Sequence, residues 1–149
     1  MLPVSRERLS DWCRRNLGAP VNEVLFEHVH LSVVTGARLT DGNLVVVKAR
    51  PFAERLHGCF EVQKILHERG FPCPEPLVPP TPLDSLAATA ERLVPGGTLL
   101  AARAAAPVLF ADALARLIAG ALGFRSADAG SGSSVERLGP RCSPYLAVG

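Results

Sequence analysis

A lysine at the end of a valine-rich segment is the residue of this sequence best suited to binding chemistry. The segment L-V-V-V-K-A-R covers residues 44–50 and contains Lys48, one of only two lysines in the chain. Alternate side chains of a strand share a face, so Leu44, Val46 and Lys48 are expected to point the same way. Because burial of a lone ammonium group is costly, we expect Lys48 to meet an anion.

The segment after this strand offers a partner for the lysine. Glu61 lies thirteen positions beyond Lys48, in a segment with helical periodicity. A strand lysine paired with a carboxylate on the next helix is the arrangement that steadies a cation against nucleotide phosphates. The alternative is a lysine that extends into solvent at the strand end, with Glu61 solvated on its helix.

Other reactive side chains form weaker patterns. His28 and His30 form an H-x-H pair that could share a metal ion, but no third ligand is evident, so we interpret them as ordinary histidines. Cys59 is interpreted as a small packing residue rather than a nucleophile. The cysteines contain no C-x-x-C pair, which favours free thiols in a reducing cytosol; they are Cys13, Cys59, Cys73 and Cys142.

The first half of the chain contains signals for one helix and a meander of strands. The segment S-R-E-R-L-S-D-W-C-R-R-N-L-G predicts a helix with Ser5 as its N-cap and Gly18 as its stop. Asp41-Gly42 lies between two apolar segments and is a strong hairpin signal. We predict three antiparallel strands, over residues 23–28, 32–39 and 43–50.

The second half begins with the helix that contains Glu61 and ends at Gly70. The six prolines of residues 71–82 predict an extended, stiff connector. A short strand follows in L-A-A-T-A-E-R-L and is broken at Pro95. An Ala-rich helix is then expected over 99–122. Beyond it, the Gly/Ser-rich segment 124–149 has no periodicity and is expected to be mostly disordered.

Length and charge limit the class of protein. With 149 residues the chain fits a single α+β domain of ordinary size, and its net charge of +2 is too weak for a nucleic-acid-binding surface. The N-terminal residues do not resemble a signal peptide, and no apolar segment is long and uninterrupted enough to span a membrane. We therefore expect a cytoplasmic protein with no nucleic-acid or membrane partner.

Four segments in this order resemble the N-terminal lobe of the kinase-like fold, and most closely that of the aminoglycoside phosphotransferases and the choline or homoserine kinases. The likeness covers about residues 5–122 and implies a small antiparallel sheet, one helix with the glutamate partner and an Ala-rich C-terminal helix. It also implies binding of ATP or GTP, with Mg²⁺ brought by the nucleotide. The segments are V-V-V-K at 45–48, E-V-Q-K-I-L-H-E-R-G-F-P-C-P-E-P-L at 61–77, A-T-A-E-R-L-V-P-G-G at 88–97 and L-A-R-L-I-A-G-A-L-G at 114–123.

For the phosphate end of a nucleotide, the resemblance implies that Lys48 contacts the α- and β-phosphates and that Glu61 orients it. Ser32 stands where a phosphate-covering turn is expected, and its hydroxyl or amide would reach a phosphate. Protein kinases place a glycine-rich loop there, whereas this chain has E-H-V-H-L-S-V-V with no glycine. Without glycine the backbone approaches phosphates less freely.

For the base end, the resemblance implies that Val34 and Val46 enclose the ring between them. The backbone groups of Glu91 and Leu93 would hydrogen-bond the edge of the base, at the segment that resembles the hinge between the two lobes of a kinase. Backbone contacts of this kind do not distinguish ATP from GTP.

The catalytic residues of the family are missing from this sequence. Its members carry an H-G-D-x-x-x-x-N loop, whose aspartate accepts the substrate proton, and a later aspartate that holds Mg²⁺. After Arg116 the only acidic residues here are Asp128 and Glu136. Loss of a positioned base alone lowers the rate by about 10²–10⁴-fold. We therefore expect little or no kinase activity from these residues alone.

The sequence thus predicts a phosphotransferase that retains its nucleotide-binding lobe and lacks most of its C-lobe. The expected divisions are an N-terminal helix at 1–18, the lobe at 19–98, a helical start of the C-lobe at 99–123 and the tail at 124–149. Apolar surface exposed by the missing half suggests self-association. The alternative is a non-catalytic interaction module that binds no nucleotide.

Overall fold

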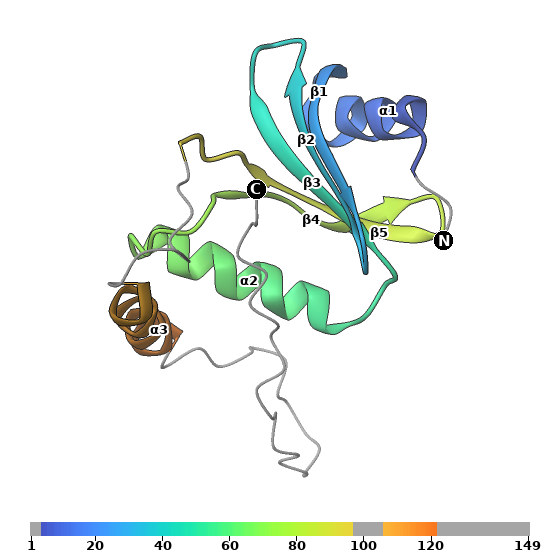
Figure 1. Ribbon diagram of the computed structural model, residues 1–149. Helices are drawn as coiled ribbons and strands as arrows, with labels where there is room; N and C mark the ends of the chain where they lie inside the picture. The colour runs from blue at the N-terminus through green and yellow to red at the C-terminus, as the bar shows by residue number, and fades with distance from the viewer. Residues whose placement is uncertain (1–3, 97–105, 122–149) are drawn as a thin grey trace. The chain divides into compact units, whose positions relative to one another are not determined.

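A computed structural model of the protein describes residues 4–96 and 106–121, and the chain divides into two compact units, Met1–Pro95 and Gly96–Gly149. The described residues form a mixed α+β fold with three helices and one five-stranded antiparallel sheet, as Figure 1 shows. The α+β class predicted from the sequence is confirmed. The predicted tail at 124–149 lies outside the described residues.

The sheet has the strand order β1-β2-β3-β5-β4, and every neighbouring pair is antiparallel. The predicted meander is confirmed, with strand ends that differ by no more than two residues from the expected ones. Strand β3, which contains Lys48, lies at the centre, between β2 and β5. The strands are β1 (Val21–Val29), β2 (Val33–Leu39), β3 (Leu44–Arg50), β4 (Pro76–Leu83) and β5 (Leu86–Arg92).

The turn between β2 and β3 forms at the predicted Asp-Gly pair. Gly42 has a φ of +87°, in the left-handed region that glycine adopts without strain. The Asp41 side chain accepts a hydrogen bond from the Asn43 amide at 3.0 Å, and the Leu39 amide donates to the Asn43 carbonyl at 2.9 Å. The turn thereby fixes the register that places Val34 opposite Lys48.

The proline-rich segment corrects one expectation from the sequence. Residues 71–82 were expected to form a connector, but Pro76–Leu83 is strand β4, at the edge of the sheet. Proline has no amide hydrogen, so it is tolerated in an edge strand, where only one side of the strand pairs. The register also shifts between Val78 and Thr81, at Pro79 and Pro80, which is how a strand accommodates residues that cannot donate.

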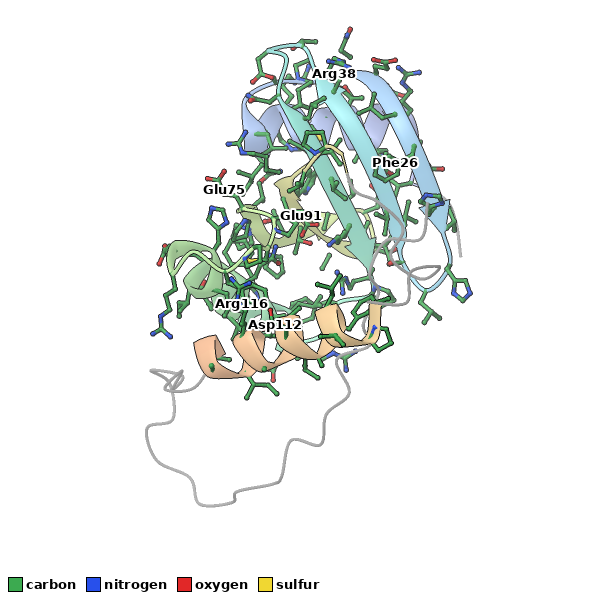
Figure 2. The ribbon with its side chains drawn as sticks, turned by 60° about the vertical axis from the view of Figure 1, so that its left-hand side comes forward. Phe26, Arg38, Glu75, Glu91, Asp112 and Arg116 are labelled. Atoms are coloured by element: carbon green, nitrogen blue, oxygen red, sulfur yellow. The ribbon has the colours of Figure 1, made fainter. Side chains whose placement is uncertain are left out.

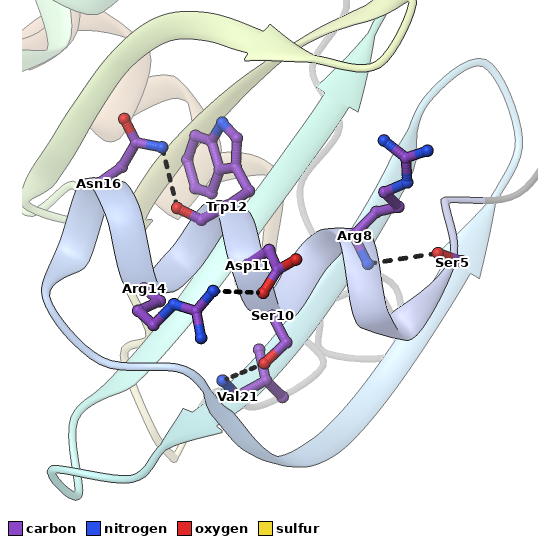
Figure 3. Close-up of polar contacts among 8 residues, drawn as sticks. All are labelled: Ser5, Arg8, Ser10, Asp11, Trp12, Arg14, Asn16 and Val21. Atoms are coloured by element: carbon purple, nitrogen blue, oxygen red, sulfur yellow. Dashed lines mark hydrogen bonds and ion pairs between the residues drawn. The ribbon is translucent and has the colours of Figure 1, made fainter.

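Helix α1 (Arg6–Leu17) begins and ends where the sequence predicts. The Ser5 side chain accepts a hydrogen bond from the Arg8 amide at 3.3 Å, and Gly18 ends the helix with a φ of +84°. Figure 3 shows this cap and the bond from the Val21 amide to Ser10 Oγ, at 3.1 Å, which ties the start of β1 to the helix.

Helix α1 packs on one side of the sheet, and this side contains the main hydrophobic core. We call it the core face. Trp12 and Cys13 are fully buried there, and Leu9 lies beside them. Alternation places every second side chain of β2, β3 and β5 on this face; the strand residues of the core include Val33, Ala37, Leu39, Val45, Val47, Ala49, Ala88 and Ala90.

Helix α2 (Arg55–Glu68) lies on the opposite side of the sheet from α1 (Figure 1). This side displays the other alternate residues of the strands, and we call it the lysine face; it includes Val34, Val46, Lys48, Arg50, Thr89 and Glu91. The predicted end of the helix near Gly70 is confirmed, since the last helical residue is Glu68 and Gly70 has a φ of +78°.

Helix α3 (Ala106–Ala121) belongs to the second unit. The Ala-rich helix was expected over 99–122, and residues 99–105 and 122 lie outside the described part. Among the residues that the structure describes, no helix has both the length and the apolar character needed to cross a membrane. Five large apolar side chains of α3 are exposed: Val108, Leu109, Phe110, Leu114 and Ile118.

Candidate functional site

Lys48 forms an ion pair, and its partner is on the sheet. The Nζ atom of Lys48 lies 2.6 Å from Oε1 of Glu91 on the neighbouring strand β5. Glu91 is opposite Val46 in the register of β3 and β5, so its side chain and that of Lys48 share the lysine face. The side chain of Glu91 is 13% exposed and that of Lys48 32% exposed, which shields the pair partly from water.

A glutamine on α2 holds the other carboxylate oxygen of Glu91. Gln63 Nε2 donates to Glu91 Oε2 at 3.1 Å and to the carbonyl of Pro74 at 3.0 Å. Gln63 therefore connects helix α2, the segment that enters β4 and the Lys48–Glu91 pair. With Lys48 and Gln63 both bonded to it, the Glu91 carboxylate is fixed in position.

The expected pair between Lys48 and Glu61 does not form in this structure. Glu61 is exposed on α2, and among the described residues it makes no ion pair. Helix α2 does line the cavity beside Lys48, but Glu61 of this helix does not pair with the lysine. Gln63 is the α2 residue that reaches the site, and it does so through Glu91.

A small cavity lies between the lysine face and α2. Its volume is about 60 Å³. Lys48 and Arg50 of β3 and Glu91 of β5 contribute its charged side chains, and Glu91 is the only acidic side chain among the described residues that line it. The other lining residues are Thr89 and Ala90 of β5, Pro76 of β4, and Leu56, Cys59, Phe60 and Gln63 of α2.

Arg50 is the second cation of this cavity. It lies two residues after Lys48 and therefore on the same face of β3. Within the part of the chain that the structure describes, Arg50 makes no ion pair, and its buried Nε atom has no hydrogen-bond partner. Arg50 was not among the site residues expected from the sequence, although its alternation with Lys48 was a signal that could have identified it.

The two valines expected to enclose a base lie on the lysine face, together with Lys48. Val34 is opposite Lys48, and Val46 is opposite Gly36. A Cβ atom on Gly36 would lie 2.2 Å from Cε1 of Phe26, so the Phe26 ring of β1 covers the glycine. Phe26 thus lies beside the position expected for the base, and it was not among the site residues expected from the sequence. Figure 2 shows Phe26 and Glu91 on the sheet.

The turn between β1 and β2 contains Ser32. The Ser32 carbonyl accepts a hydrogen bond from the His30 amide at 3.1 Å. Because Val33 is opposite Ala49, this turn lies at the end of the sheet where β3 carries Lys48 and Arg50. The turn contains no glycine, and none of its residues has a positive φ. A role for Ser32 in phosphate binding stays a prediction.

The segment that resembles a hinge has one of its expected donors already in use. The Leu93 amide donates to the Leu44 carbonyl at 3.0 Å, so it is not free to bind the edge of a base. Glu91 lies within β5, where it is opposite Val46 on one side and Pro76 on the other. Its backbone is therefore part of the sheet, and its side chain is the group that reaches the cavity.

A partly buried cysteine, Cys73, lies near Glu91. Cys73 Sγ lies 3.7 Å from the Gln63 carbonyl, and burial raises the pKa of this thiol above its ordinary value. A backbone hydrogen bond opposes that rise, and the Glu91 charge adds to it. Cys13 and Cys73 are free thiols. No group of three or more histidine, cysteine or acidic side chains in the described ranges could hold a metal ion.

The geometry provides a partly buried cation pair with one carboxylate, next to a small cavity on the central strands. Comparison of the sequence with models of protein families and with curated proteins finds no match. The likeness to the kinase-like phosphotransferases therefore rests on the sequence segments themselves.

Proposed function

We propose that the lobe formed by residues 19–98 binds a nucleotide, ATP or GTP, with Lys48 as the cation that meets its phosphates. The observation on which this rests is the position of Lys48. Its Nζ atom extends from the central strand β3 into a cavity and is steadied there by a carboxylate at 2.6 Å. In protein kinases a glutamate of the following helix holds the lysine that meets the α- and β-phosphates; here Glu91 of β5, rather than a residue of α2, holds Lys48.

The arrangement of elements supports this proposal. The resemblance implies a meander whose third strand carries the lysine, then a helix, a proline-rich connector and a strand that leads to the hinge; the described residues follow this order, except that the proline-rich segment forms strand β4. Val34 and Val46 lie on the same face as Lys48; Val46 is buried, and the half-buried Val34 leaves some apolar surface beside the cation. Such a surface suits a base, because ligand sites combine apolar walls with a few charged groups.

The residues that catalyse phosphoryl transfer in this family have no counterpart in the sequence. The sequence contains no H-G-D-x-x-x-x-N pattern and no later aspartate of the metal-binding type. Catalysis of this reaction depends on positioning and on neutralisation of charge by metal ions, and those groups are not provided by the described residues. We propose nucleotide recognition as the activity of this lobe, with little transfer by these residues alone.

A second candidate function is a non-catalytic interaction module. It is favoured by the same ion pair, because Glu91 already compensates the charge of Lys48. A lysine that is satisfied within the fold needs no phosphate, and the turn at Ser32 lacks the glycines that allow close approach to one. In this case Lys48 stabilises the contact between β3 and β5 and has no role in binding a nucleotide.

The proposal is tested by titrating a fluorescent ATP analogue, with Mg²⁺ present, into the wild type and into Lys48→Met. The other lysine of the chain, Lys64, is exposed on α2 and does not line the cavity, so Lys64→Met is the matched control. Nucleotide binding predicts saturation in the wild type and about tenfold weaker binding in Lys48→Met, which corresponds to about 1.4 kcal/mol. Lys64→Met should bind like the wild type.

The two candidate functions differ in the outcome of the wild-type titration. If the wild type shows no saturable binding, the nucleotide proposal is wrong and the interaction module is favoured. If both lysine variants lose binding equally, the effect is one of net charge and not of the Lys48 site. Circular dichroism of each variant confirms that the fold is retained.

A further inference from the structure

The charges that line the cavity between α2 and the lysine face are unbalanced. Two cations, Lys48 and Arg50, face it, and Glu91 is the only acidic side chain among its described lining residues. Both carboxylate oxygens of Glu91 already have partners: Oε1 pairs with Lys48 at 2.6 Å, and Oε2 accepts a hydrogen bond from Gln63 at 3.1 Å. The described groups around the cavity therefore leave one positive charge without a counter-ion.

That charge belongs to Arg50, whose hydrogen bonding is also incomplete. Its Nε atom is buried, and no described residue accepts its hydrogen. Buried polar groups of proteins nearly always have a partner, and a donor on a charged group is among the most costly to leave unpaired. An arginine in this state is suited to an oxyanion, because the guanidinium group presents several donors that match carboxylate and phosphate oxygens.

We propose that Arg50 and Lys48 together form a binding site for one tetrahedral oxyanion, either a free phosphate or one phosphoryl group of a nucleotide. Arg50 supplies the uncompensated charge and the unused Nε donor. Lys48, held by Glu91, supplies a second donor from the same strand. This inference deepens the proposed function and rests on it where the oxyanion belongs to a nucleotide; a free phosphate tests the site by itself.

The size of the cavity limits what can enter it. Its volume of about 60 Å³ is several times the roughly 10–15 Å³ that one water needs by the same measure and well below the roughly 300 Å³ of the smallest ligand pockets, so it has room for a phosphoryl group but not for a nucleoside. Leu56 and Phe60 of α2 line it with apolar surface, which lowers the local dielectric and strengthens the attraction between an anion and the two cations. A nucleotide would place one phosphoryl group here and its sugar and base outside.

The experiment is an isothermal titration of inorganic phosphate, and separately of ATP, into the full chain and two variants. Arg50→Gln removes the charge and the guanidinium group. Arg38→Gln is the matched control. It removes the same charge from the same sheet, but Arg38 pairs with Glu23 and does not line the cavity. We expect phosphate to bind the wild type and Arg38→Gln alike, and to bind Arg50→Gln about tenfold more weakly or not at all.

The two ligands separate failure of this site from failure of the proposed function. Phosphate binding that depends on Arg50, without ATP binding, supports the oxyanion site and contradicts nucleotide recognition. ATP binding that depends on Lys48 but is unchanged in Arg50→Gln overturns the Arg50 site and leaves the proposed function standing. Absence of phosphate binding by the wild type also overturns the Arg50 site.

A second variant covers the case in which Arg50→Gln fails to fold. Arg50→Lys retains the positive charge but has no Nε donor at the same position and no planar fork. The proposal predicts phosphate affinity between those of the wild type and Arg50→Gln. Affinity equal to that of the wild type would mean that charge alone attracts the anion and would overturn the role of the Nε donor.

Discussion

The two faces of the sheet are built by alternate residues of the same strands, yet they have different chemistry. On the core face, Val45 and Val47 of β3 pack with the fully buried Trp12 of α1. On the lysine face, Lys48 and Arg50 of the same strand meet Glu91 and the polar groups of α2. One strand thus supports an apolar core on one side and a charged site on the other.

The difference indicates how stability and binding are divided in this protein. Burial of apolar area is the main source of folding free energy, and most of it lies under α1. Helix α2 buries only Leu56 and Leu66 and is held to the sheet partly through Gln63. The core face is therefore expected to determine stability, and the lysine face carries the charges on which the proposed binding rests.

The largest effect is expected from truncation of the core residue that α1 contributes. Trp12 is 0% exposed, so Trp12→Ala removes a large buried side chain and should lower the free energy of unfolding by about 3–5 kcal/mol. Trp12→Phe is the control, since the indole Nε1 has no described partner to lose. Urea unfolding measures both; a loss below 1 kcal/mol for Trp12→Ala would mean that the core face does not dominate.

An alkaline titration tests the same face. Burial raises the pKa of Cys13 from 9.0 to about 11, so between these pH values the native thiol keeps its proton while the unfolded one loses it. The native state then binds more protons, and stability falls as pH rises, by up to about 2–3 kcal/mol. Cys13→Ala should remove this part of the slope in unfolding measured from pH 8 to 11. An unchanged slope would contradict burial of the thiol.

A smaller effect is expected where β1 meets β2 on the lysine face. In Gly36→Ala the new methyl group would meet Phe26 Cε1 at 2.2 Å, so the ring must move, at a cost of about 1–3 kcal/mol. In a Phe26→Ala background the same substitution should cost less, with a coupling of about 0.5–3 kcal/mol. A double-mutant cycle by urea unfolding measures the coupling, and additive effects would show that the ring does not need the glycine.

The smallest effect is expected from the ion pair. Glu91→Gln leaves Lys48 without its counter-ion in a partly exposed position, so stability should fall by about 1–2 kcal/mol, between the values of exposed and buried pairs. Glu61→Gln, on the exposed side of α2, should stay within about 0.5 kcal/mol of the wild type. If Glu61→Gln is the more destabilising of the two, the helix glutamate is the true partner of Lys48.

Local features of this protein could be predicted from its sequence because they depend on near neighbours. Ser5 begins α1 and Gly18 ends it, through contacts within one helical turn. The backbone preferences of Asp41-Gly42 determine the hairpin between β2 and β3. The alternation in L-V-V-V-K-A-R likewise placed Lys48 on the opposite face from Val45 and Val47. None of these predictions needed the tertiary structure.

The partner of Lys48 depended on information that the sequence does not display. Glu91 is forty-three positions away and reaches Lys48 only because β5 pairs with β3 in one particular register. The prolines of β4 concealed that strand, since proline disfavours strands except at an edge, and edge position is itself a property of the whole sheet. Gln63 had no signal that distinguished it from its polar neighbours on α2.

The proline content of β4 also gives the sheet two unequal borders. An outer strand normally presents a row of amide hydrogens to which another chain can add, and this is a common start of aggregation. Pro76, Pro79, Pro80 and Pro82 remove four amide hydrogens from β4, and because amides of adjacent residues point to opposite edges, part of this loss falls on the outer border. The β1 border contains no proline from Val21 to Val29. Any strand that a partner chain adds to this sheet is therefore directed to β1, far along the sheet from the Glu91 side chain.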